Sequence, residues 1–195
     1  MILDRYFGNG IPVFAFSYVK EEAVKNNIQV LQPERARDEA FVEELRTYNA
    51  DVIVVVAFGQ LLPASIINMP RYGCINVHAS LLPKYRGASP IQWAVIDGCE
   101  YSGVTTMKMD EGLDTGDILM VEKVKLDAKE TGGSLFDRLS DVGAHLLVKT
   151  LEGLETGSII PEKQNEAESS YVKMLKKSMG ELDFTKSARQ IECLI

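Results

Sequence analysis

Asn76 and His78, two positions apart in this sequence, carry an amide and an imidazole that could act together on a substrate. They alternate with Ile75 and Val77, and in an extended chain side chains two apart point to the same side. Asn76 offers an amide donor, and His78 a ring that can hold or release a proton near neutral pH. Such a pair can stabilise an oxyanion beside a proton-transfer group. A strand end whose two polar residues bond the backbone is the alternative, and both stay open on these residues alone.

A second candidate is the acidic connection at residues 110–117, which holds several acids and two glycines between predicted strands at 104–109 and 118–126. Acids and glycines in a strand connection suggest a metal loop, but the spacing does not fit an EF-hand. A structural turn, in which Asp side chains bond local N–H groups, is the common interpretation of such a run. The residues alone do not decide between these.

Composition and charge limit the class of protein. A chain of 195 residues that is 46% hydrophobic suits one α/β domain with a sizeable core. The net charge of -7 argues against a polybasic nucleic-acid binder, so any RNA contact would need a local patch. Three scattered cysteines favour a reducing compartment over a disulfide frame or a zinc knuckle. We expect a cytoplasmic protein without a signal peptide or membrane span.

Hydrophobic periodicity predicts the elements that must position the candidate residues. Residues 52–57 are apolar throughout, which is typical of a parallel strand buried on both faces. The helix predicted over 38–49 precedes it, as in a doubly wound sheet. The remaining patterns predict helices over 17–26, 89–98 and 134–157, and strands over 28–31, 104–109 and 118–126. The fold class is therefore α/β.

The segment Phe58 to Leu62 follows the predicted strand at 52–57. Open α/β sheets bind their ligands at the carboxyl ends of their strands. Gly59 would allow a flat ligand to approach the backbone closely. A plain strand-to-helix turn explains the same residues equally well.

The two ends of the chain carry weaker patterns. Residues 1–16 show no clear periodicity and do not predict a first strand, and residues 161–171 are polar and linker-like. From the residues alone we therefore expect a linker after the helix predicted over 134–157. His145, beside the apolar stripe of its helix, is expected to be structural.

Three motifs, in this order and spacing, resemble the folate-dependent formyltransferases, and among them most closely those that act on initiator methionyl-tRNA. The motifs are Asn76-x-His78, Ser80-Leu81-Leu82-Pro83-Lys84-Tyr85-Arg86-Gly87 with Ala88-Ser89-Pro90-Ile91-Gln92 after it, and Leu113-Asp114-Thr115-Gly116-Asp117. The resemblance covers about Ser17 to the end. It implies a Rossmann-like formyltransferase domain with a mostly parallel sheet, taking its one-carbon unit from 10-formyltetrahydrofolate without a metal.

The resemblance also implies roles for individual residues. Asn76, His78 and Asp114 match catalytic positions: Asn76 and His78 would stabilise the tetrahedral intermediate, and Asp114 would orient the imidazole and favour its protonated form. Arg86 matches a loop residue near the substrates. The folate would contact a set of residues from three segments, namely Phe58, Gly59, Gln60, Leu61, Leu62, Ser80, Leu81, Leu82, Pro83 and Glu111.

Two departures from the family pattern leave alternatives open. Family members begin with a strand and a Gly-Thr-Pro turn that residues 1–16 do not match, so the first strand is expected to be absent or replaced. They also carry a C-terminal barrel that binds tRNA. The resemblance therefore implies a catalytic domain at 1–160, incomplete at its N-terminus, followed at 161–195 by a linker and the start of a truncated C-terminal region. A sugar-nucleotide N-formyltransferase, or a folate-binding fragment without turnover, are the alternatives. The expected protein is a monomer of the bacterial cytosol whose partners are folate and initiator methionyl-tRNA.

Overall fold

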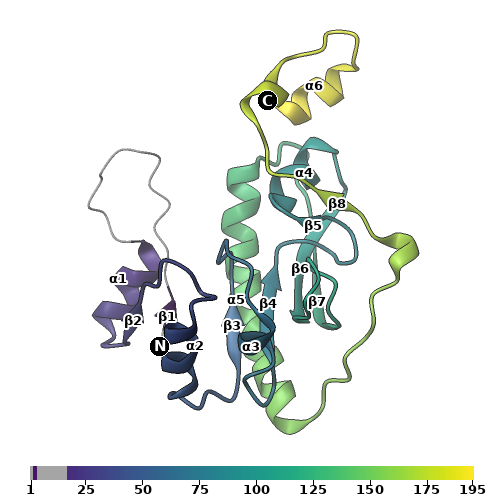
Figure 1. The fold of residues 1–195 in the computed structure, drawn as a ribbon. Coiled ribbons are helices and arrows are strands. Elements are labelled where there is room, and N and C mark those ends of the chain that lie inside the picture. Colours follow the sequence, from purple (N-terminus) through teal and green to yellow (C-terminus); the bar gives the residue numbers. More distant parts are fainter. Residues whose placement is uncertain (1, 4–16) are drawn as a thin grey trace.

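A computed structural model of the chain describes residues 2–3 and 17–195 (Figure 1). Its elements, in chain order, are β1 (Ile2–Leu3), α1 (Tyr18–Lys25), β2 (Val30–Leu31), α2 (Glu39–Arg46), β3 (Ile53–Val55), α3 (Ala64–Ile67), β4 (Cys74–His78), β5 (Arg86–Gly87), α4 (Pro90–Ile96), β6 (Tyr101–Lys108), β7 (Ile118–Lys125), α5 (Gly132–Thr156), the 3-10 turn Glu166–Glu168, β8 (Tyr171–Val172), the 3-10 turn Lys177–Gly180 and α6 (Ala188–Leu194). Helices and strands are interspersed along the chain, as the α/β prediction requires. None of the helices described is both long and apolar enough to cross a membrane.

The central sheet has the strand order β3-β4-β6-β7. β3 runs parallel to β4, whereas β4 with β6 and β6 with β7 pair antiparallel. The prediction of a mostly parallel sheet is therefore corrected to a mixed one. The reason is that β6 and β7 are joined by the short acidic connection at residues 110–117, and so short a connection joins only antiparallel strands.

A short first strand is present in the structure. Ile2 and Leu3 pair parallel with Val30 and Leu31 of β2, apart from the central sheet. The prediction that the chain lacks a first strand is wrong for these two residues, because so short a strand leaves no periodicity in the sequence. The remaining residues of that segment, 4–16, lie outside the described part of the chain.

β3 differs from the strand that its apolar run predicts. Val54 is 37% exposed and Val56, just after the strand, 58% exposed. β3 is an edge strand of the central sheet and pairs with β4 alone in the described part of the chain. Burial on both faces was therefore wrong, because the apolar pattern does not reveal where in a sheet a strand lies.

The long helix α5 fixes the position of β4. It begins with a capping box of Thr131 and Ser134 and ends at Gly157, near the predicted bounds. A Cβ at Gly143 would lie 3.3 Å from Val77 Cγ1, so the missing side chain lets α5 approach β4 closely. His145 is exposed on this helix, with Nδ1 2.7 Å from the carbonyl oxygen of Asp141, which agrees with a structural residue.

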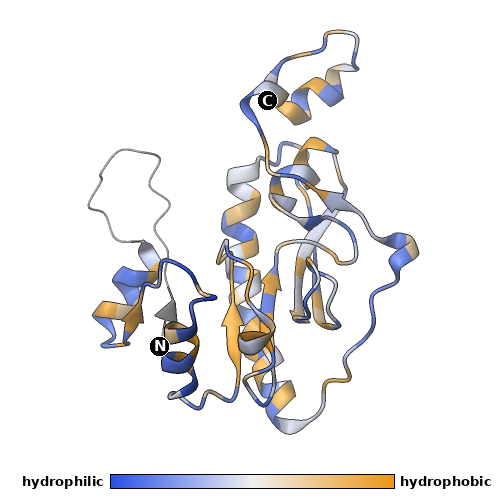
Figure 2. Cartoon of the chain, in the orientation of Figure 1, coloured by the Kyte–Doolittle hydropathy of each residue, from blue (hydrophilic) through white to orange (hydrophobic). Residues whose placement is uncertain are grey.

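Two hydrophobic clusters hold β4 between them. The first joins α2, α3 and the start of β4, and the second joins α4, α5 and β6. Figure 2 shows the apolar residues concentrated along β3 and β4. Cys74 belongs to the first cluster, and Val77 packs against the second. Because residues of both clusters pack with β4, the carboxyl end of this strand has a fixed position in the fold.

Candidate active site

The end of β4 brings Asn76 and His78 together with Asp114. Asn76 Nδ2 donates to Asp114 Oδ1 at 3.3 Å, and His78 Nδ1 lies 3.7 Å from Asp114 Oδ2. Both side chains reach the same carboxylate, so they share one face of the strand, as their spacing predicts. The side chains of His78 and Asp114 are only 7% and 12% exposed. The three polar groups thus form one cluster shielded from most solvent.

The His78 ring is oriented by one neighbouring group and lies near the negative charge of another. Its Nε2 lies 2.9 Å from the carbonyl oxygen of Tyr85. A carbonyl only accepts, so Nε2 must carry the proton. The 3.7 Å between Nδ1 and Asp114 is longer than a direct hydrogen bond. Tyr85 therefore sets the orientation of the ring, while Asp114 contributes a nearby negative charge.

Asp114 is fixed through both its side chain and its backbone. Its φ of 55° is left-handed, a conformation that Asp tolerates better than most residues. The carboxylate Oδ2 accepts from the Gly87 N–H at 2.8 Å, and the carbonyl accepts from Gln164 Nε2 at 2.8 Å. The carboxylate therefore has one defined position relative to His78.

Asn76 keeps a donor that the cluster does not use. Its amide carries two N–H groups, and a single protein contact, to Asp114, engages that amide in the described part of the chain. The side chain is half-buried rather than sealed in the core. A second N–H on a fixed amide is suited to donate to an oxygen that gains negative charge.

Arg86 is fully buried, with an exposed fraction of 0%. Its guanidinium donates to both carboxylate oxygens of Glu166, at 3.0 and 2.7 Å, and to the hydroxyl of Tyr171 at 2.9 Å. Its Nε donates to Gln164 Oε1 at 3.0 Å. The hydrogen bonds that Arg86 donates to the Glu166 carboxylate raise the pKa of Arg86 above its ordinary value, so the side chain stays charged. Arg86 holds its loop to the chain beyond α5; a contact with substrate remains a prediction.

The segment predicted as a linker, residues 161–171, is part of the site. After α5 the chain returns along the molecule to β8, which pairs parallel with β5 (Figure 1). Gln164, Glu166 and Tyr171 were missed by sequence reasoning, because polar residues without periodicity give no signal of what they contact. The domain boundary at residue 160 remains a prediction, but the chain beyond it cannot be treated as a free linker.

Gly87 makes the pairing of β5 with β8 possible. Its φ is +99°, and a Cβ there would lie 2.5 Å from the carbonyl oxygen of Val172. Only glycine fits so close a backbone approach. The same residue donates its N–H to Asp114. This position therefore joins the pairing of the two short strands to the geometry of the cluster.

The turn at Ser80 to Pro83, predicted to contact folate, bonds mainly to itself and to β6. Ser80 Oγ donates to the carbonyl of Lys84 at 2.7 Å, and Thr105 Oγ1 donates to the carbonyl of Ser80 at 2.7 Å. The Leu82 N–H donates to the same Thr105 hydroxyl at 3.2 Å. Ser80 and Leu82 are buried, so their side chains shape the turn. A folate contact by this turn stays a prediction.

The other predicted folate segment, Phe58 to Leu62, is more open. Phe58 and Leu62 pack against the first core cluster, whereas Leu61 is 84% exposed. Gln60 Oε1 accepts from the Ala36 N–H at 3.0 Å, and its Nε2 is buried with no hydrogen-bond partner among the described residues. The segment offers a donor and an exposed apolar side chain, which suits a flat ligand with a polar edge.

The acidic connection is divided between two roles. Asp110 Oδ1 accepts from the Gly112 N–H and the Thr115 hydroxyl, as in a structural turn. Asp114 instead turns towards β4, and Glu111 is exposed. Within residues 2–3 and 17–195, no group of three or more His, Cys, Asp or Glu residues could hold a metal ion.

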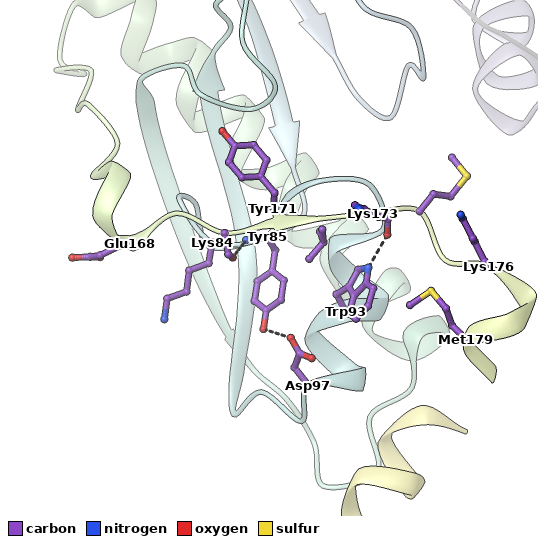
Figure 3. Close-up of a pocket in the computed structure, with 12 residues that line it drawn as sticks. Lys84, Tyr85, Trp93, Asp97, Glu168, Tyr171, Lys173, Lys176 and Met179 are labelled. Atoms are coloured by element: carbon purple, nitrogen blue, oxygen red, sulfur yellow. Dashed lines mark hydrogen bonds between the residues drawn. The ribbon is translucent and has the colours of Figure 1, made fainter. Parts of the chain in front are cut away.

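A pocket of about 660 Å³ lies beside the β5–β8 pair (Figure 3). Tyr85, Trp93 and Tyr171 line it together with several lysines. Trp93 Nε1 donates to the carbonyl of Lys173 at 2.8 Å, so the indole is fixed by the returning chain. The pocket adjoins the cluster through Tyr85, whose carbonyl binds His78.

Comparison with known proteins places this geometry in a family. The sequence pattern described as formyl transferase matches residues 3–151. The chain is 87% identical over 180 residues to a methionyl-tRNA formyltransferase of Lachnospira eligens, covering 92% of this chain and 57% of the relative. It is 56% identical over 192 residues to that of Agathobacter rectalis, covering 98% of this chain and 62% of the relative. The chain thus spans about three fifths of the length of these relatives.

Solved structures share the fold at lower sequence identity. A 4-N formyltransferase from Francisella tularensis superposes with a TM-score of 0.73 at 24% identity, covering 90% of this chain and 71% of that one. A sugar N-formyltransferase from a Shewanella species gives a TM-score of 0.72 at 21% identity, covering 89% and 68%. The predicted Rossmann-like architecture is confirmed by these likenesses. The sequence match over residues 3–151, which is more than half of the chain, shows that it belongs to the formyl transferase family.

Proposed function

We propose that the chain carries the formyl-transfer site of a methionyl-tRNA formyltransferase, which moves the formyl group of 10-formyltetrahydrofolate to the amino group of initiator methionyl-tRNA. The observation that carries the chemistry is the cluster of Asn76, His78 and Asp114 at the end of β4. The acceptor is supported by the 87% identity to the Lachnospira eligens relative. Cytosolic location and a monomeric state are part of the same proposal.

Asn76 stabilises the charge that develops during transfer. The folate co-substrate supplies an already activated formyl carbon, so the protein needs to hold charge and move a proton. When the amine attacks, the formyl oxygen becomes negative, and the second N–H of Asn76 donates to it. One fixed donor of this kind contributes about 3 kcal/mol to lowering the barrier. Asp114 holds the amide in place through its other N–H.

His78 moves the proton. Since Nε2 is bonded to the Tyr85 carbonyl, Nδ1 is the ring nitrogen left to accept a proton from the attacking amine. The same nitrogen can then pass the proton to the leaving nitrogen of the folate. The Asp114 carboxylate, 3.7 Å away, reduces the cost of the positive charge on the ring.

We propose that the folate lies along residues 58–62, and two features of that segment support this. The buried Nε2 of Gln60 matches an acceptor on a heteroaromatic ring, and the exposed Leu61 matches its apolar face. Further contacts are proposed with the Ser80–Pro83 turn and the backbone at Glu111. The residues present thus fit the donor that the resemblance implies.

A parallel assay tests the function and its alternatives. The purified protein is given 10-formyltetrahydrofolate with either methionyl-tRNA or an amino-sugar nucleotide, and the Lachnospira eligens relative serves as the positive control. Formyl-methionyl-tRNA is the expected product. Transfer to the sugar would keep the chemistry and replace the acceptor. Folate binding without transfer to either acceptor would support a binding protein and overturn the proposal.

A further inference from the structure

We propose that Gln164 is a positioning residue for formyl transfer, acting on His78 through Asp114; this rests on the function proposed above. The Gln164 side chain joins three segments far apart in sequence. Its Nε2 donates to the carbonyls of Asp114 at 2.8 Å and Gly116 at 2.7 Å, and its Oε1 accepts from Arg86 Nε at 3.0 Å. One amide thus links the chain beyond α5 to the catalytic loop and to the buried arginine.

The chemistry of the partners fixes the orientation of this amide. Both backbone carbonyls can only accept, and the guanidinium of Arg86 can only donate. Rotating the amide by half a turn would point its oxygen at two carbonyls and its NH2 at a guanidinium. All three hydrogen bonds would be lost, so a single arrangement satisfies the site.

Asp114 is the residue that most needs this support. Its left-handed backbone costs some energy even for Asp, so contacts that hold this conformation stabilise the loop. Gln164 donates to the carbonyls on both sides of Thr115, and these two hydrogen bonds hold the turn that carries Asp114. Without these two hydrogen bonds the turn can relax, and the Asp114 carboxylate would then move relative to the His78 ring.

Gln164 is in turn held by a rigid neighbour. Arg86 is fully buried and bound to Glu166 and Tyr171, so the acceptor of Gln164 has a fixed partner. The next residue, Gly87, donates its N–H to the Asp114 carboxylate. One network therefore reaches Asp114 twice, through Gln164 at its backbone and through Gly87 at its side chain.

The first test reads the geometry without turnover. The chain has two histidines, so the ring resonances of His78 and His145 can be followed by NMR after histidine labelling. Gln164→Met keeps the size of the side chain and removes its hydrogen bonds, and Lys163→Met places the same residue at an exposed neighbour. We expect the His78 resonances to move in Gln164→Met alone, while those of His145 stay. Unmoved His78 resonances in Gln164→Met would overturn the proposal.

The second test separates the contact with Asp114 from the contact with Arg86. Gln164→Glu keeps an acceptor for Arg86 but turns a carboxylate towards the two carbonyls. We expect it to lower kcat as much as Gln164→Met does, by roughly ten- to a hundredfold, with KM for the folate within about twofold. If Gln164→Glu restored the rate, the residue would serve only to hold Arg86. Urea unfolding of each variant shows whether the folded state is retained.

A double-mutant cycle tests the route through Asp114. If Gln164 acts by placing that carboxylate, then Gln164→Met should cost less than about twofold once Asp114→Asn has been made. Equal costs in both backgrounds would overturn the proposal. A wild-type protein without transfer activity would refute the proposed function, and the His78 resonances would still decide whether Gln164 positions the cluster.

Discussion

Two segments that follow neighbouring strands are held in opposite ways: residues 79–87, which follow β4 and end with β5, and residues 58–62, which follow β3. The first is fastened by side-chain hydrogen bonds to distant parts of the chain, such as Gly87 to Asp114 and Arg86 to Glu166. The second makes one side-chain hydrogen bond within the described residues, from the Ala36 N–H to Gln60. It is anchored instead by apolar side chains in the first core cluster.

This contrast indicates which part of a transferase site must be rigid. Groups that stabilise charge or move protons work only if they are fixed before the reaction begins, so they need many directional bonds. A surface that binds a flat substrate needs exposed area more than exact placement. The chain beyond α5 contacts the first segment through Gln164 and Glu166, and rigidity is therefore concentrated where the chemistry is proposed.

The largest difference is expected between two amides, that of Asn76 in β4, next to the first segment, and that of Gln60 within the second segment. Asn76→Ala should lower kcat by about a hundred- to a thousandfold with folate affinity nearly unchanged, since the oxyanion exists only along the reaction path. The matched change Gln60→Ala should raise KM for the folate more than it lowers kcat. Steady-state kinetics of both variants provide the measurement. An unaltered rate for Asn76→Ala would remove this residue from the mechanism.

Gly87→Ala should break the rigid segment itself. A Cβ there meets the Val172 carbonyl at 2.5 Å in a left-handed backbone, and we expect a loss of about 3 kcal/mol in unfolding free energy. Gly157→Ala is the matched control, with a φ of +68° and nothing within 4 Å, and should cost about 1 kcal/mol. Urea unfolding compares the two. Equal losses of unfolding free energy in the two variants would mean that the close approach of β8 to Gly87 does not affect stability.

Acidification should loosen the same segment through Glu166. Its hydrogen bonds from Arg86 hold the pKa of Glu166 below the ordinary value of 4.5. A lowered folded-state pKa stabilises the protein above pH 4.5, and this contribution is lost as the pH falls through the folded value.

The Glu166→Gln variant should therefore have a lower unfolding free energy than the wild type at neutral pH. Its unfolding free energy should also change less than that of the wild type on acidification. Urea midpoints between pH 7 and pH 3 measure this, with Glu168→Gln as the control because Glu168 bonds Asn165 instead of Arg86. A Glu166→Gln variant whose stability follows the wild-type pH profile would show that the pair does not contribute.

The smallest effect is expected at the tip of the open segment. Leu61 is 84% exposed, so Leu61→Ser should change unfolding free energy by less than about 0.5 kcal/mol. If the folate lies along this segment, the variant should still raise KM for the folate with kcat unchanged. An unchanged KM would move the folate away from Leu61 and leave the segment a plain turn.

Sequence reasoning was most successful where local patterns decide structure. The alternation around Asn76 and His78 placed both side chains on one face, and capping residues such as Thr131 and Gly157 marked the ends of α5. Asp114 was linked to them by resemblance alone, since nothing in its own loop distinguishes it from Asp110. The structure separates the two, with Asp110 bonded within the turn and Asp114 bonded to β4.

The longer helices and strands, and the pair of polar residues at the end of β4, could be predicted from the sequence because periodicity and caps act over a few neighbouring residues. The two-residue strands β1, β5 and β8 and the short helix α3 are too short to give such a pattern. The tertiary structure alone decided the mixed order of the sheet, the edge position of β3 and the burial of Arg86. It also brought Gln164 into hydrogen-bond contact with the loop of Asp114, 50 residues away. Such contacts depend on where packing brings distant segments together, and a local sequence pattern gives no information about those long-range contacts.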